Sequence, residues 1–200
     1  KYFDKKAYVA VAGFFKKLDT YIFTQTKEFD FSNYFPANYL MSDGRPLARR
    51  VGNYTAAYNG NGGILKGVEL SGSMPLNLLT PVLDGFGVSA STTYTDSKIA
   101  IEDPSGSIGS NIPLPGLSKR TTNLTAYYEK NGFETRISQR RRSDFVGEIG
   151  NFSNDRALRY VVGENVVDFQ VGYTFNSGAM KGVGLVLQIN NLRNAAYETY

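Results

Sequence analysis

The chain has 200 residues, with 22 Lys and Arg against 18 Asp and Glu, and it contains no Cys, His or Trp. Without Cys and His there is no thiolate nucleophile, no Ser-His-Asp triad and no ordinary zinc or haem site, so we expect neither a metal nor a cofactor. The net charge of +4 is small and is not clustered, which argues against a nucleic-acid partner.

The composition favours β-structure over a helical core. Tyr (14) and Phe (13) supply much of the 42% of residues that are hydrophobic, and 21 residues are Gly, which is typical of strands and turns. No stretch approaches about 18 consecutive apolar residues, so no transmembrane helix is predicted. A transmembrane β-strand needs only about 10 residues and is compatible with this sequence.

Alternating hydrophobicity predicts about seven strands and no helix. In the third strand, Phe86, Val88 and Ala90 share an apolar face. Ser89 and Ser91 fall on the opposite face, which is small and polar, as a period of two requires. In chain order the predicted strands lie at about residues 7–26, 64–74, 86–95, 122–129, 133–144, 167–175 and 183–190.

The connections alternate between short and long. Short segments join the second strand to the third, the fourth to the fifth and the sixth to the seventh, and Asn131-Gly132 is a tight-hairpin signal. The long connections, at about residues 27–62, 98–119 and 147–164, are rich in Gly, Pro, Asn, Ser and Asp. Short turns at one end and long loops at the other are typical of an outer-membrane barrel.

The polar faces and the aromatic residues support the same prediction. Small polar side chains replace the Lys and Glu that the water-facing side of a soluble sandwich usually carries, so they fit a barrel lumen. Aromatic residues beside the short turns fit a girdle at the membrane boundary, although they would also fit the core of a soluble sandwich. The expected girdle residues are Phe86, Tyr128, Phe133, Tyr173 and Phe175.

Several segments resemble the C-terminal part of TonB-dependent outer-membrane receptors. One of them, Asn-Asn-Leu-x-Asn at residues 190–194, resembles the end of the penultimate strand in that family. The order and spacing of the segments over nearly the whole chain carry the resemblance. The segments are residues 14–19, 64–71, 114–119, 127–129 with 132–133, 141–145 and 186–192.

The resemblance implies an all-β, antiparallel, up-and-down transmembrane barrel of about 22 strands around an N-terminal plug domain. Residues 1–200 would be the C-terminal part of that barrel, without the plug, the N-terminal strands and the last strand. The long loops would then be extracellular and the short turns periplasmic.

The implied function is active transport and not catalysis. A scarce solute (an iron chelate, cobalamin or an oligosaccharide) would bind at the surface of a Gram-negative cell and enter the periplasm. Outer-membrane lipid, lipopolysaccharide, the plug domain and the TonB energy complex would be the other partners.

The alternatives are a porin or adhesin barrel and a soluble β-sandwich binding module. An enzyme built on Glu129 and Glu134 is disfavoured, because both are more simply luminal groups near a turn.

The first long loop supplies candidate ligand-binding residues. Its aromatic rings alternate with Asp and Asn and would stack on a sugar or an aromatic chelate, with a preference for carbohydrate. The same rings would alternatively pack as a small core within the loop. These candidates are Phe29, Phe31, Tyr34, Phe35 and Tyr39.

A second candidate site lies on the fifth predicted strand. Arg136, Arg140 and Arg142 share one face, with Asp144 after them. On a luminal face these arginines would bind the plug domain or an anionic ligand through bidentate hydrogen bonds. Arg141 is expected to face outward, toward lipopolysaccharide phosphates.

Overall fold

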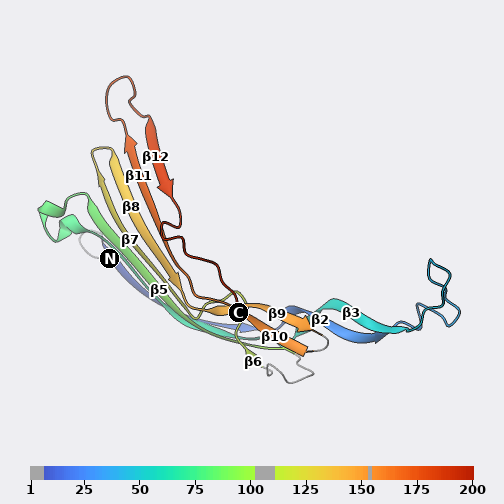
Figure 1. Ribbon diagram of the computed structural model, residues 1–200. Helices are drawn as coiled ribbons and strands as arrows, with labels where there is room; N and C mark the ends of the chain where they lie inside the picture. Colours follow the sequence, from blue (N-terminus) through green and yellow to red (C-terminus); the bar gives the residue numbers. More distant parts are fainter. Residues whose placement is uncertain (1–6, 102–110, 153–154) are drawn as a thin grey trace.

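Seven long antiparallel strands form one curved wall (Figure 1). The computed structural model describes residues 7–101, 111–152 and 155–200. The strand order across the wall is the order along the chain, which confirms the all-β, up-and-down prediction. The wall strands are β1 (Tyr8–Leu18), β4 (Gly63–Pro75), β5 (Phe86–Ala100), β7 (Arg120–Lys130), β8 (Phe133–Arg142), β11 (Asn165–Thr174) and β12 (Gly184–Ile189).

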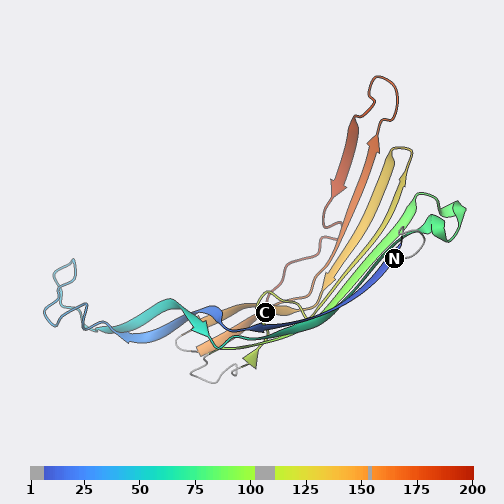
Figure 2. The ribbon, with the colours of Figure 1, turned by 180° about the vertical axis from the view of Figure 1, so that it is seen from behind.

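Two of the predicted long loops contain two-stranded ribbons. β2 (Tyr21–Asp30) pairs with β3 (Val51–Gly60), and β9 (Phe145–Phe152) pairs with β10 (Asp155–Val161). The predicted first strand is therefore two strands, because the chain leaves the wall after Leu18 and β2 pairs with β3 instead. Both ribbon views show the β2–β3 ribbon extending away from the wall (Figures 1 and 2).

The short turns all lie at the opposite end of the wall. The β4–β5 turn contains the single-turn 3-10 helices η1 (Leu76–Leu78) and η2 (Pro81–Leu83). In the β7–β8 turn, Asn131 and Gly132 have φ values of 53° and 85°, as the predicted tight hairpin requires. Within the described residues, no helix is long and apolar enough to cross a membrane.

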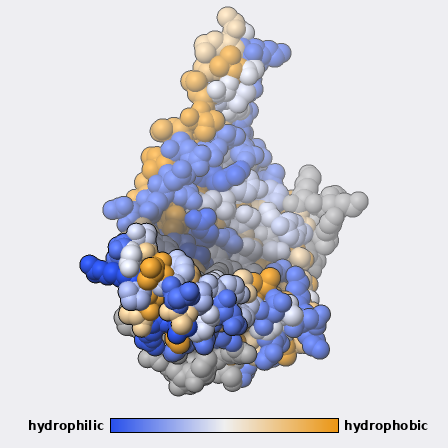
Figure 3. Space-filling model, turned by 90° about the vertical axis from the view of Figure 1, so that its right-hand side faces the viewer, coloured by the Kyte–Doolittle hydropathy of each residue, from blue (hydrophilic) through white to orange (hydrophobic). Residues whose placement is uncertain are grey.

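Strand register separates an apolar face from a polar face. Large side chains on the apolar face, such as Val11 (75% exposed), have no second layer packed on them in the described chain. Figure 3 shows the hydrophobic residues gathered along one side of the upper wall. One apolar row runs across the wall through Met74, Val88, Ala126, Ile137, Phe169 and Ile189. The neighbouring polar row consists of Ser73, Ser89, Thr125, Ser138 and Asp168.

A buried core lies where the ribbons meet the long-loop end of the wall. Phe23 of β2, Ile99 of β5 and Ile112 of β6 (Asn111–Ile112) are buried together. Tyr58 of β3 and Leu158 of β10 pack against them. This core, called the rim core below, holds both ribbons on the wall.

Candidate functional site

The tip of the β2–β3 ribbon is closed by hydrogen bonds at its base. The backbone N–H of Phe31 donates to the carbonyl of Arg50 (2.8 Å). The carboxylate of Asp30 accepts hydrogen bonds from the hydroxyl and the backbone N–H of Ser32, and these bonds lower the pKa of Asp30. The tip, residues 31–50, is therefore a defined structure at the end of the ribbon.

All five predicted ligand-binding residues belong to one aromatic cluster at this tip. Phe29 and Phe31 meet edge to face at 4.8 Å between ring centroids, as do Phe35 and Tyr39. Tyr34 contacts both Phe29 and Phe31, yet 69% of it is exposed. The cluster therefore combines a small loop core with rings that face solvent.

The polar face of the wall carries Arg136 and Arg140, opposite Tyr127 and Asn123 of β7. The guanidinium of Arg136 lies 3.8 Å from the carboxylate of Glu129. Among the described residues, Arg140 forms no ion pair and is exposed. The Arg140 side chain is therefore open on the polar face of the wall.

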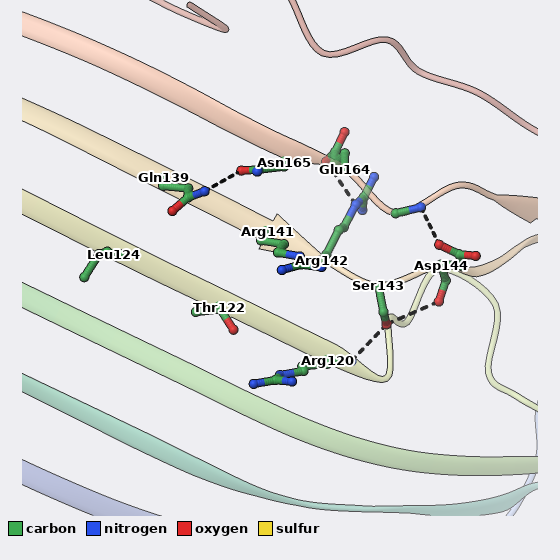
Figure 4. A pocket seen from close by; sticks show the side chains of 11 residues that line it. Arg120, Thr122, Leu124, Gln139, Arg141, Arg142, Ser143, Asp144, Glu164 and Asn165 are labelled. Atoms are coloured by element: carbon green, nitrogen blue, oxygen red, sulfur yellow. Dashed lines mark hydrogen bonds and ion pairs between the residues drawn. The ribbon is translucent and has the colours of Figure 1, made fainter. Parts of the chain in front are cut away.

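Arg142 and Asp144 make contacts at the end of β8. The Arg142 guanidinium lies 2.9 Å from Glu164 and 4.4 Å from the centre of the Phe145 ring. Asp144 lies beyond the strand, where its carboxylate accepts a hydrogen bond from the backbone N–H of Gly163 (2.7 Å; Figure 4). Both side chains thus connect β8 to the segment that enters β11.

Sequence comparison decides between the remaining alternatives. Residues 1–192 match the family described as TonB dependent receptor-like, beta-barrel. The chain belongs to this TonB-dependent receptor family. No curated protein and no solved structure matches the chain. Membership confirms the resemblance and displaces the porin, adhesin and soluble-sandwich alternatives, because the family consists of outer-membrane transporters.

Family membership assigns the two faces of the wall. In a TonB-dependent receptor barrel, the apolar face meets lipid and the polar face lines the lumen. The five predicted girdle residues all lie at the short-turn end. Phe86 and Tyr128 are 4.6 Å apart, and Tyr173 and Phe175 are 5.1 Å apart, measured between ring centroids. Phe133 lies beside Tyr128 at 6.1 Å.

The sequence pattern does not indicate two residues of these surfaces. Tyr54 of β3 contacts Phe29 (5.7 Å between ring centroids), but the sequence predicts a loop for its segment. Arg120 begins β7 on the lipid-facing side, and only the strand register reveals that placement. In the described part of the chain, no group of three or more His, Cys, Asp or Glu could hold a metal ion.

Proposed function

We propose that this chain is the C-terminal barrel portion of a transporter that captures a scarce solute at the cell surface and moves it into the periplasm. Within the described residues, β1 and β12 each pair on one side only. Open strand edges are not tolerated in lipid, which supports further barrel strands elsewhere in the polypeptide. Transport would use the family's plug domain and the TonB complex.

The aromatic cluster on the β2–β3 ribbon is the proposed capture surface. It stands on the extracellular side, and Tyr34, Tyr39 and Phe29 present exposed rings. Exposed Asn33 and Asn38 supply hydrogen-bonding groups beside these rings. Ring faces next to amides suit a sugar, which favours an oligosaccharide over an iron chelate or cobalamin.

The luminal arginines are the proposed contact with the plug domain. Arg140 is the strongest candidate because it has no ion pair among the described residues. A plug carboxylate would form bidentate hydrogen bonds with its guanidinium. Arg136 lies four residues before Arg140 on the same face and would extend this contact.

The capture surface is tested by substituting its most exposed ring. The full receptor containing this chain is titrated calorimetrically with an oligosaccharide panel, ferric chelates and cobalamin. We expect one oligosaccharide class to bind, and Tyr34→Ala to weaken that binding by up to about tenfold, because one stacking partner is lost. Tyr197→Ala is the matched control, since Tyr197 is 70% exposed and lies outside the ribbon.

Two results would contradict the proposal in different ways. Equal affinities of Tyr34→Ala and Tyr197→Ala for the bound solute would remove the ribbon from the binding site. Selective binding of a ferric chelate or cobalamin, still weakened by Tyr34→Ala, would keep the capture surface and overturn the oligosaccharide assignment.

A further inference from the structure

The lipid-facing side of the wall carries two neighbouring arginines at its extracellular end. Arg141 of β8 is opposite Thr122 of β7, and Arg120 is two residues from Thr122 on the same face. The arginines are therefore diagonal neighbours on adjacent strands, a relation that places their Cα atoms about 7–8 Å apart. Figure 4 shows their side chains on either side of Thr122.

These arginines line a cavity of about 750 Å³ together with Gln139 and Asn165. The amide of Gln139 donates to Asn165 (2.9 Å), so these two side chains satisfy each other. Both arginines are exposed, and neither forms an ion pair with a described residue.

The other charged groups of the cavity are already engaged. Glu164 lies 2.9 Å from the guanidinium of Arg142. Asp144 accepts hydrogen bonds from the backbone N–H of Gly163 and the hydroxyl of Tyr200. The cavity is lined by three arginines (Arg120, Arg141 and Arg142) and only these two carboxylates, so it favours an anion.

Two lysines elsewhere on the lipid-facing side form ion pairs. At the short-turn end, the Lys130 ammonium lies 3.0 Å from Asp84. At the extracellular end, Lys66 lies 3.8 Å from Asp96. Arg120 and Arg141 lack such partners, although they stand where the wall leaves the apolar band. Headgroup phosphates occupy that level of a membrane and attract unpaired basic residues.

An apolar groove begins at the same residues. Arg120 and Thr122 also line a groove of about 390 Å³, together with Val9, Leu70 and Ala90. A second groove of about 310 Å³ shares Val9 and Ala90 with the first and continues past Val88 toward the short-turn end. A charged cavity that opens into an apolar groove fits an amphiphile better than a free anion.

We propose that Arg120 and Arg141 bind the phosphate of a phosphorylated glycolipid in the outer leaflet, with one acyl chain in the groove. Each planar guanidinium can donate two parallel hydrogen bonds to a phosphate. Lys119 lies beside them, with its ammonium 5.5 Å from the centre of the Tyr94 ring, and it adds positive charge to the site. The site rests on the outer-membrane address of the receptor and is independent of the transported solute.

The test measures binding of diphosphoryl lipid A to the full receptor in detergent by native mass spectrometry. We expect Arg120→Gln with Arg141→Gln to weaken binding by about tenfold or more, because two charge-assisted contacts are lost. Arg45→Gln with Arg49→Gln removes the same charge from the distant ribbon tip and is expected to retain parent affinity. The two single variants, Arg120→Gln and Arg141→Gln, give intermediate losses and replace the double variant if it fails to fold.

Two further probes separate a lipid from a free phosphate. Dephosphorylated lipid A is expected to bind much more weakly than lipid A, and Ala90→Trp, which fills the groove, is expected to weaken lipid A binding. Equal binding of phosphorylated and dephosphorylated lipid A would overturn the proposal. So would inorganic phosphate that binds as tightly as lipid A, or parent affinity in the arginine variants. Solute titration of the same samples reports the proposed transport function separately.

Discussion

At the scale of single residues, Asp84 shows how charge is neutralised at the short-turn end of the wall. Its carboxylate lies 3.0 Å from the Lys130 ammonium and also accepts a hydrogen bond from Asn77 (3.5 Å). Lys130 lowers the pKa of Asp84, first through its hydrogen bond to the carboxylate and then through its positive charge. This contact ties the β4–β5 turn to the end of β7, next to Phe86 and Tyr128 of the predicted girdle.

The lowered pKa of Asp84 predicts a loss of stability in acid. A carboxyl group whose pKa is lower in the folded state contributes stability above its unfolded pKa of about 3.9, and this is lost as the pH falls through the folded pKa. We expect the melting temperature of the receptor in detergent to fall over that range, and to fall less steeply in Asp84→Asn. Asp43→Asn, in the ribbon tip, is the control. An unchanged acid slope in Asp84→Asn would exclude this contribution.

Single residues also mark the limit of prediction from sequence. The face of Arg136 and Arg140 follows from a period of two, and the structure places both on the polar side. The position of Asp144 cannot be predicted in this way, because the two-residue alternation of side chains ends with strand β8 at Arg142. Its hydrogen-bond partner Gly163 is 19 residues away, and no local pattern indicates such a contact.

At the scale of elements, the wall strands were predictable and the ribbons were not. Lipid on one side and a lumen on the other impose an alternation that can be read directly from β5, β11 and β12. The β2–β3 ribbon has neither environment. Its strands are held by cross-strand contacts such as Thr26 to Thr55 (2.8 Å between hydroxyl oxygens) and by the rim core, so its sequence lacks that alternation.

The β7–β8 hairpin gives a test at this scale. A Cβ atom on Gly132 would lie 2.3 Å from the carbonyl oxygen of Thr174, and its φ of 85° disfavours any side chain. We expect Gly132→Ala to destabilise the receptor by roughly 1–3 kcal/mol. Denaturant unfolding in detergent measures the change.

Gly178 provides the matched control for this hairpin. Its φ of 75° is similar, but nothing lies within 4 Å of the position of its Cβ. Gly178→Ala therefore carries the backbone strain without the steric clash, and we expect a smaller loss of stability. Equal losses in the two variants would show that the contact with Thr174 contributes nothing.

At the scale of the whole molecule, the polar face of the wall is expected to hold the plug domain. Reversing the charge of Arg140 would place a carboxylate opposite the proposed plug carboxylate. We expect Arg140→Glu to increase hydrogen exchange of the plug surface in the full receptor, measured by mass spectrometry, because this contact becomes repulsive.

Arg141→Glu is the control, because it makes the same change on the lipid-facing side. It is expected to leave plug exchange at the parent level. An identical exchange pattern in Arg140→Glu and the parent receptor would remove Arg140 from the plug contact.

The order of strands in the wall also bears on how the chain folds. Every wall strand pairs with the wall strand that precedes it along the sequence, and the two ribbons are insertions between consecutive wall strands. Pairings between such near neighbours have a low loop-closure cost, and local contacts favour fast folding. The wall can therefore assemble one hairpin at a time at a growing edge, without a search for distant partners. A ribbon could lengthen or shorten during evolution while this assembly sequence stayed the same.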